Sequence, residues 1–186
     1  MSRAGLDDRH AAAPHDTIAA MATHAQRQHV RHFLDFCHNH ANGLLYPPGD
    51  QRTARDTISW NMSEQHLEHV LESGGKWQGD CSEFGSYVLK CAGLWHWSSP
   101  GYTGSHLQLL PDHYTDGKQA NIGALVIFGL DHSPTGVHEA IVMEPDHTHG
   151  DPIVASHGRP GFDRLRVSQL AVGGLSGHTY LSIAHL

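Results

Sequence analysis

Trp77 to Gly93 of this chain read WQGDCSEFGSYVLKCAG, and this stretch decides the fold that we expect. Its apolar residues from Phe84 to Ala92 recur at helical spacing, so they line one face of a helix. Gly79-Asp80 leads into the first turn, and Gly93 closes the last one. The stretch therefore predicts a helix with an apolar face for packing, and this helix carries Cys81 at its N-terminus.

Two more helices are predicted on the N-terminal side of this one. The first starts at Asp16 and stops at Asn42-Gly43, and each half carries apolar residues at helical spacing. The second spans Glu64 to Glu72 and ends before two glycines. Residues 1–16 are polar and Ala-rich, so we expect them to form a flexible tail ahead of a single domain at 17–186.

After a Gly- and Ser-rich loop at 95–105, the pattern changes to short β-type runs that are separated by turn signals. These runs are Ala124–Phe128, Val137–Met143, Pro152–His157, Leu165–Val167 and Tyr180–Ile183. Helices followed by about five strands are typical of an α+β fold in which helices pack on an antiparallel sheet.

The charge and the hydropathy of the chain argue against several classes of protein. With 12 Lys and Arg against 19 Asp and Glu, the net charge is −7, and no basic stripe is present to neutralise phosphates, so we expect no nucleic-acid partner. No stretch approaches the roughly 18 apolar residues of a membrane helix. The segment Met1–Thr23 lacks the apolar core of a secretory signal, so we expect synthesis in a cytoplasm without a signal peptide.

The cysteine and histidine content leaves one kind of chemistry open. The three cysteines, Cys37, Cys81 and Cys91, form neither a disulfide framework nor a C-x-x-C zinc site. The 19 histidines are scattered and lack the spacing of known zinc motifs, so we expect no metal site. A reactive thiol remains open. Cys81 is the candidate, because the unpaired N–H groups at a helix N-terminus lower the pKa of a thiol.

A thiol nucleophile needs a base beside it and a third group that holds the base in the right tautomer. His138 lies near the start of one predicted strand, and His157 ends the next one. Because neighbouring strands of an antiparallel hairpin lie side by side, these two histidines can face one another. Cys37 and Cys91 are better explained as small buried hydrophobic residues.

Several ordered segments from residue 44 onward resemble the NlpC-type cell-wall peptidase superfamily. The family pattern is D-C-S-G-F, then P-G-D-L-V-F-F, then H-V-A/G-I, then a polar residue on the next strand. The chain has DCSEF at 80–84, LVIFG at 125–129, VHEAIV at 137–142 and IVASHG at 153–158. It is similar in particular to the peptidase domains of endolysins from phages of actinobacteria, which share the GYTG segment at 101–104.

This resemblance implies a papain-like core in which the helix that carries the cysteine packs on the sheet. It implies Cys81 as nucleophile, His138 as general base and acid, and His157 as the orienting third residue. Three more residues are implied for the oxyanion or for substrate binding: Tyr46, Asp80 and Ser82. The implied substrate is the stem or cross-bridge peptide of peptidoglycan, cut through a thioester with water as acceptor and without a cofactor.

The chain departs from the family pattern at two positions near the site. Glu83 replaces a small glycine, and we expect its side chain to point outward, away from the thiol. Glu139 follows the base in place of valine, and Glu139 or Glu144 remains an alternative to His157 as the third residue.

The resemblance also implies where the protein acts. It would be made in a host cytoplasm and would act at the bacterial cell wall, either as an endolysin with holin-dependent release or as a virion-associated lysin. Alternatives on the same scaffold are an N-acetylmuramoyl-L-alanine amidase, a transpeptidase or a deamidase. Alternatives from other classes are a catalytically silent virion or structural module and a histidine-based metalloenzyme.

Overall fold

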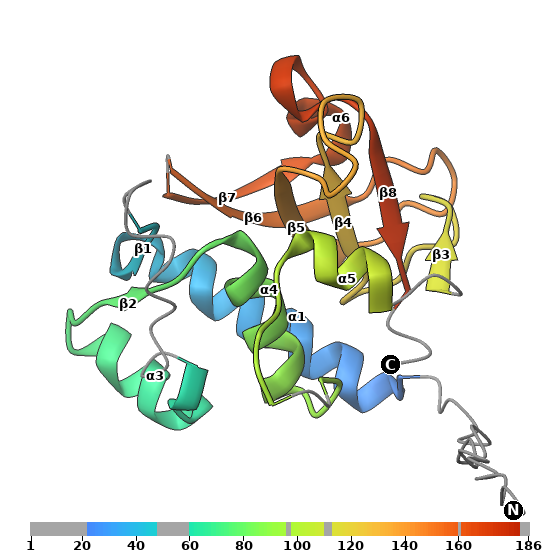
Figure 1. Ribbon diagram of the computed structural model, residues 1–186. Coiled ribbons are helices and arrows are strands. Elements are labelled where there is room, and N and C mark those ends of the chain that lie inside the picture. Colours follow the sequence, from blue (N-terminus) through green and yellow to red (C-terminus); the bar gives the residue numbers. More distant parts are fainter. Residues whose placement is uncertain (1–21, 48–59, 96–97, 110–112, 160, 183–186) are drawn as a thin grey trace, which may run out of the picture.

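The computed structural model describes residues 22–47, 60–95, 98–109, 113–159 and 161–182, so the predicted tail at 1–16 lies outside the described residues. Its elements are α1 (His24–Asn39), η1 (Ala41–Gly43), β1 (Leu44–Leu45), α3 (Glu64–Glu72), β2 (Trp77–Gln78), α4 (Cys81–Cys91), α5 (Thr103–Leu109), β3 (Tyr114–Thr115), β4 (Leu125–Phe128), β5 (His138–Glu144), β6 (Ile153–Gly158), β7 (Gly161–Arg166), α6 (Val167–Leu170), η3 (Gly173–Leu175) and β8 (His178–Leu181). Helices precede most of the strands along the chain, and Figure 1 shows α1, α3 and α4 gathered beneath the sheet. The fold is therefore α+β, as predicted.

Helix α4 forms where the sequence predicts a helix, from Cys81 to Cys91. Asp80 is its N-cap, and the Asp80 Oδ1 accepts a hydrogen bond of 2.8 Å from the main-chain N–H of Glu83. This bond satisfies one of the free N–H groups of the first helical turn. At the other end Gly93 has a φ of 68°, a left-handed conformation that glycine adopts without steric strain. Every residue from Cys81 to Leu89 is buried, so α4 lies at the centre of the core.

Helix α1 is shorter than the predicted helix. The Thr23 side chain accepts from the Gln26 N–H at 3.2 Å, and the Gln26 side chain accepts from the Thr23 N–H at 2.9 Å. This capping box starts a helix at His24, and Thr23 itself is extended. The predicted continuous helix is therefore interrupted at Thr23, and its predicted start at Asp16 lies outside the described residues, while α3 has the predicted bounds. Among the described residues, no helix is both long and apolar enough to cross a membrane.

Six strands form one antiparallel sheet in the order β3-β8-β4-β5-β6-β7. Each of the five predicted runs overlaps a strand, although the last two runs share only two residues each with β7 and β8, and β3 adds a two-residue edge strand. Strand β7 begins at Gly161, earlier than predicted, because residues 161–166 form a hairpin with β6. The segment 103–109 forms α5, although the sequence suggested a loop up to residue 105.

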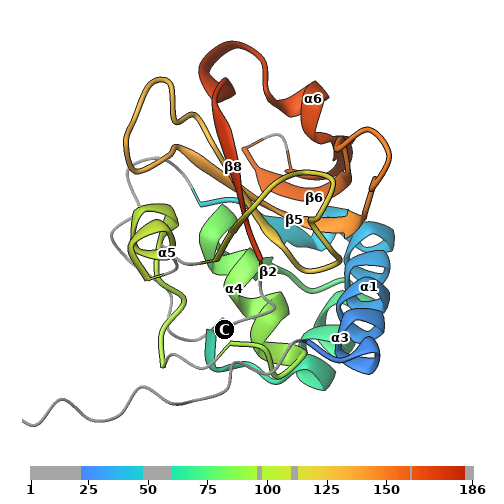
Figure 2. The same cartoon turned by 90° about the vertical axis from the view of Figure 1, so that its right-hand side faces the viewer.

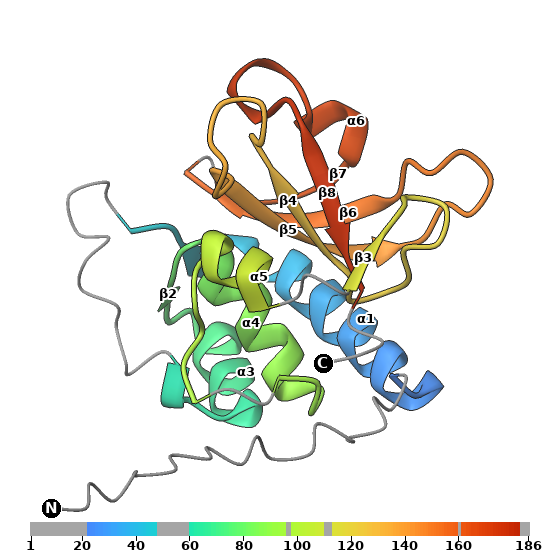
Figure 3. The same ribbon diagram turned by 45° about the vertical axis from the view of Figure 1, so that its right-hand side comes forward.

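The two faces of the sheet carry separate apolar clusters, because side chains alternate between faces along a strand. Leu125 and Ile141 lie on the face that packs against α1 and α4, which we call the α4 face. Val126 and Phe128 lie on the opposite face with Val167 of α6, which we call the α6 face. Figures 2 and 3 show α4 on one side of the sheet and α6 on the other.

A short parallel strand pair, separate from the six-stranded sheet, joins the segment after α1 to the segment before α4. Leu44 of β1 pairs with Trp77 of β2, and the Gly79 N–H donates to the Leu45 carbonyl at 3.2 Å. This pairing brings the chain around Tyr46 beside the residues that lead into Cys81. Two segments that are distant in sequence therefore meet at the N-terminus of α4.

Candidate active site

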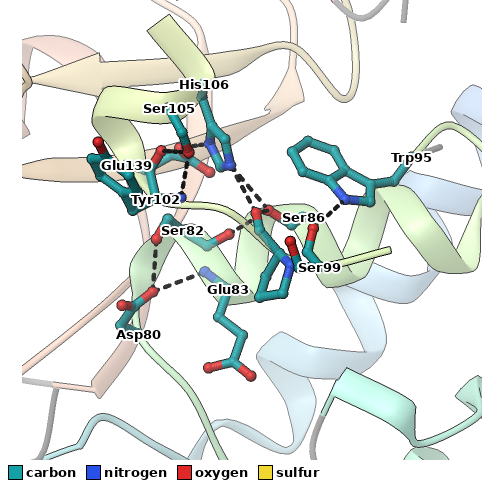
Figure 4. A network of polar contacts seen from close by, with 11 residues as sticks. Asp80, Ser82, Glu83, Ser86, Trp95, Ser99, Tyr102, Ser105, His106 and Glu139 are labelled. Carbon is teal, nitrogen blue, oxygen red and sulfur yellow. Dashed lines mark hydrogen bonds and ion pairs between the residues drawn. The ribbon is translucent and has the colours of Figure 1, made fainter. Parts of the chain in front are cut away.

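Cys81 is the first residue of α4, and its neighbours form the cap of that helix. The Asp80 Oδ1 accepts from the Ser82 hydroxyl at 2.8 Å as well as from the Glu83 N–H. Asp80 and Ser82, which were expected to bind the oxyanion or the substrate, therefore bond to each other within the cap, as Figure 4 shows. Glu83 is only 6% exposed, so its side chain does not extend into solvent as expected, although its charge is not among those that raise the pKa of Cys81.

Cys81 is buried, with 7% of the residue exposed. The main-chain N–H of Glu139 and the hydroxyl of Tyr46 donate hydrogen bonds toward it, and both favour the thiolate. Burial and the negative charges of Asp80 and Glu139 act more strongly in the other direction, and together they raise the pKa of Cys81 to about 12. The resting thiol is therefore protonated at neutral pH, and a proton acceptor is needed to activate it.

His138 begins β5 on the α6 face of the sheet. Its Nε2 lies 2.8 Å from the Ser156 hydroxyl on β6, within hydrogen-bonding distance. Burial, and then the charge of His157, lower the pKa of His138 to about 4. The imidazole is therefore neutral at neutral pH, which is the form that accepts a proton. Among the described residues its hydrogen-bond partner is Ser156 and not Cys81.

His157 lies on the α4 face, with its ring among Trp77, Phe84 and Tyr46. Its Nε2 donates to the carbonyls of Gly79 at 3.0 Å and Leu45 at 3.2 Å, so the proton of the neutral ring is on Nε2. Burial lowers the pKa of His157. The ring thus ties β6 to the residues that come just before Tyr46 and Cys81 in the chain.

The two histidines do not pair, although their strands are neighbours as predicted. Ala140 pairs with Ser156, and continuing this antiparallel register places His157 opposite Glu139 rather than His138. Because faces alternate along a strand, His138 and His157 point to opposite faces. The hydrogen bond that orients His138 comes from Ser156, a residue that the sequence analysis did not select. Its signal was its position, one residue before His157 on the same strand.

The two glutamates that were alternatives for the third position are engaged elsewhere. The Glu139 carboxylate points to the α4 face and lies 2.6 Å from the Nδ1 of His106. Glu144 is bound by Arg31 at 3.1 Å and by Arg164, at the far end of β5 from His138. Neither carboxylate contacts His138. The role of His106 could not be inferred from its sequence neighbours.

A pocket of about 270 Å³ opens on the α6 face beside His138. Its polar wall contains Tyr46, His138, Ser156, Arg159 and Asp163, and much of the remaining wall is leucine. Tyr46 also contacts the sulfur of Cys81, so this side chain links the buried thiol to the pocket. A substrate in the pocket would lie against His138 and close to the opening of α4.

Other residues of the described chain offer no alternative centre. Cys37 is fully buried, and burial raises the pKa of both Cys37 and Cys91. Within the described ranges, no group of three or more His, Cys, Asp or Glu side chains is arranged to hold a metal ion. In comparisons with known proteins, no family model, no curated protein and no solved structure matches the chain.

Proposed function

We propose that this protein is a cysteine hydrolase of the NlpC type that cuts a peptide bond in the stem or cross-bridge peptide of peptidoglycan. The observation that carries the proposal is the setting of the Cys81 sulfur at the opening of α4, where the Glu139 N–H and the Tyr46 hydroxyl both donate to it. Hydrogen-bond donors directed at a sulfur stabilise the thiolate, and such donors can also stabilise the oxyanion of an acyl-transfer intermediate.

In the proposed reaction, His138 takes the proton of Cys81 and the sulfur attacks the peptide carbonyl carbon. The Cys81 N–H and the Tyr46 hydroxyl hold the oxyanion. His138 then gives its proton to the amine that leaves, and a thioester remains on Cys81. Water, deprotonated by His138, attacks the thioester, and collapse of the intermediate releases the acid and restores the thiol.

During this cycle the His138 imidazole has to leave its hydrogen bond with Ser156 and contact the Cys81 thiol instead. His138 is directly bonded through its carbonyl to the Glu139 nitrogen whose N–H reaches the sulfur, so the two reacting side chains are anchored at adjacent points of the backbone. A rotation of the His138 side chain at the first residue of β5 supplies the exchange. His138 also lines the pocket, where a substrate can displace it from Ser156.

The substrate class rests on the order of the motifs from DCSEF to IVASHG, together with the α+β fold that carries them. In a papain-like arrangement the cysteine helix packs on an antiparallel sheet. The packing of α4 on one face of the sheet supports this proposal. We propose action at the bacterial cell wall, as an endolysin or a virion-associated lysin.

The test is digestion of purified actinobacterial and other peptidoglycans, followed by mass spectrometry of the released fragments. We expect new amino and carboxyl ends within the stem or cross-bridge peptide, and we expect none with Cys81→Ala. Cys91→Ala is the matched control and should leave digestion intact. Release at the lactyl amide of muramic acid would instead indicate an amidase, and full activity of Cys81→Ala would refute the proposal.

A second candidate is a catalytically silent module that retains the fold. The contact of His138 with Ser156 and the raised pKa of Cys81 favour it, because a silent module needs no link between the thiol and a base. Treatment with iodoacetamide at neutral pH separates the two. A silent module leaves Cys81 unlabelled in the presence and absence of peptidoglycan fragments, whereas a hydrolase shows Cys81 labelling that depends on His138.

A further inference from the structure

A buried pair of ionisable side chains lies next to the thiol. The Nδ1 of His106 on α5 is 2.6 Å from the Oε2 of Glu139 on β5, and both side chains are fully buried. The Nε2 of His106 donates to the Pro100 carbonyl at 2.8 Å. Figure 4 shows the imidazole of His106 between Glu139 on one side and Ser86 on the other. The pair therefore joins α5 to β5 on the α4 face of the sheet.

The Glu139 carboxylate lies against the same side of α4 as the thiol. A Cβ placed on Gly85 would be 2.5 Å from the Glu139 Oε1, so a larger residue would force this carboxylate to shift. Gly85 follows Cys81 by one helical turn, and residues at this spacing share a helix face. In the described part of the chain, the Glu139 Oε1 has no hydrogen-bond partner. His106 is therefore the only partner found there for this carboxylate.

We propose that His106 is a positioning residue for Cys81: it holds and neutralises the Glu139 carboxylate so that the sulfur can become negatively charged one helical turn away. The inference rests on the proposed function for its biological meaning, because a thiolate is needed only if Cys81 is a nucleophile. The pairing itself acts on the thiol with or without a substrate.

The physical reason is the low polarity of the site, where a bare carboxylate repels a nearby thiolate strongly. The negative charges of Asp80 and Glu139 both raise the pKa of Cys81. Burial lowers the pKa of His106, but the charge and hydrogen bond of Glu139 outweigh it and leave that pKa raised. With its proton on His106 the pair is neutral overall, but the Glu139 carboxylate is the member whose charge acts on the sulfur, so His106 weakens this repulsion without removing it.

The other titratable groups near Glu139 come from the elements packed against it. They are Asp80 and Cys81 at the start of α4 and His157, which the strand register places opposite Glu139 on β6. None of these three groups contacts the Glu139 carboxylate directly, whereas His106 does. The charge of this carboxylate is therefore controlled mainly from α5, an element that does not carry the thiol.

The test is the rate of Cys81 alkylation by iodoacetamide at fixed pH between 8 and 9, read for each cysteine by peptide mass mapping. Glu139→Gln keeps the shape and removes the charge, so we expect alkylation about tenfold faster, corresponding to a pKa lowered by about one unit. His106→Leu leaves the carboxylate alone, and we expect alkylation about tenfold slower. The double variant should behave like Glu139→Gln.

The opposite signs of the two single variants distinguish this role from a purely structural one, because a loosened core would expose the thiol and speed alkylation in both. His106→Asn, which keeps a donor for Glu139 without a charge, replaces His106→Leu if the latter fails to fold. Glu64→Gln is the matched control: the His29–Glu64 pair has a distance of 2.8 Å on the surface of α1 and α3, and its loss should not change Cys81.

Single variants that change the rate in the same direction, or not at all, overturn the inference. Because alkylation needs no substrate, this result is independent of the proposed function. If the wild-type protein leaves peptidoglycan intact but the two single variants change the alkylation rate in opposite directions, only the proposed function is refuted. If the wild-type protein digests peptidoglycan but the two single variants do not change the alkylation rate in opposite directions, only the role of His106 is refuted.

Discussion

Replacement of Gly85 by alanine tests how closely α4 lies against the buried pair. The added methyl group would be 2.5 Å from the Glu139 Oε1 and 3.3 Å from the Leu125 Cδ2. Alanine inside a helix is about 1 kcal/mol more favourable than glycine. Overpacking costs about 1–3 kcal/mol, and disturbing a hydrogen bond to a charged group costs about 1.5–3 kcal/mol. We expect Gly85→Ala to lower the free energy of unfolding by about 2 kcal/mol.

The assay is equilibrium unfolding in urea together with thermal unfolding. For a domain of this size, 1 kcal/mol shifts Tm by roughly 2–4 °C, so we expect a loss of about 4–8 °C. The control is Gly174→Ala, because a Cβ at Gly174 meets nothing within 4 Å and its φ is not positive. That change should stabilise the protein by about 0.4–1 kcal/mol. A Gly85→Ala variant at least as stable as the wild type would refute the close packing of α4 on Glu139.

Three further predictions concern the residues around the thiol. Asp80→Ala should lower the free energy of unfolding by about 1 kcal/mol because the cap of α4 is lost, whereas Asp80→Asn should retain most of it; equal losses in urea would contradict this role. The pKa of His138 is lowered from 6.5 to about 4, so the folded state binds its proton less readily than the unfolded state. Stability should therefore fall by up to about 3 kcal/mol as pH drops from 6.5 to 4, and His138→Asn should flatten this slope in unfolding curves measured across that range. Ser156→Ala should cost about 1–3 kcal/mol by removing the partner of buried His138, while Ser168→Ala on exposed α6 provides a comparison with a smaller expected loss.

The elements that the sequence predicted best are those with local signals. Helix α4 has a capping residue before it, a regular apolar face and a glycine after it, and these signals need no information from the rest of the chain. The start of α1 was missed because the capping box at Thr23 and Gln26 was not recognised among other helix-forming residues. Helix α5 was missed because its glycine and serine residues resemble those of a loop.

The faces of the central strands could not be predicted from local pattern. Six of the seven residues of β5 are buried, so polar and apolar residues do not alternate and the sequence does not reveal which side chains face α4. The register with β6 decides this, and it separates His138 from His157. The contact of Tyr46 with Cys81 likewise depends on the pairing of β1 with β2, two strands of only two residues each.

The donors to the Cys81 sulfur come from positions 46 and 139, on either side of it in the chain. During synthesis on a ribosome, the helix that carries the sulfur emerges well before β5 and β6. The nascent chain therefore has an ordinary cysteine thiol at position 81 until about residue 158 has been made and the hairpin of β5 and β6 has formed. An unfinished chain would therefore lack the proposed peptidase activity, since the donors and the base around the sulfur are assembled only late in translation.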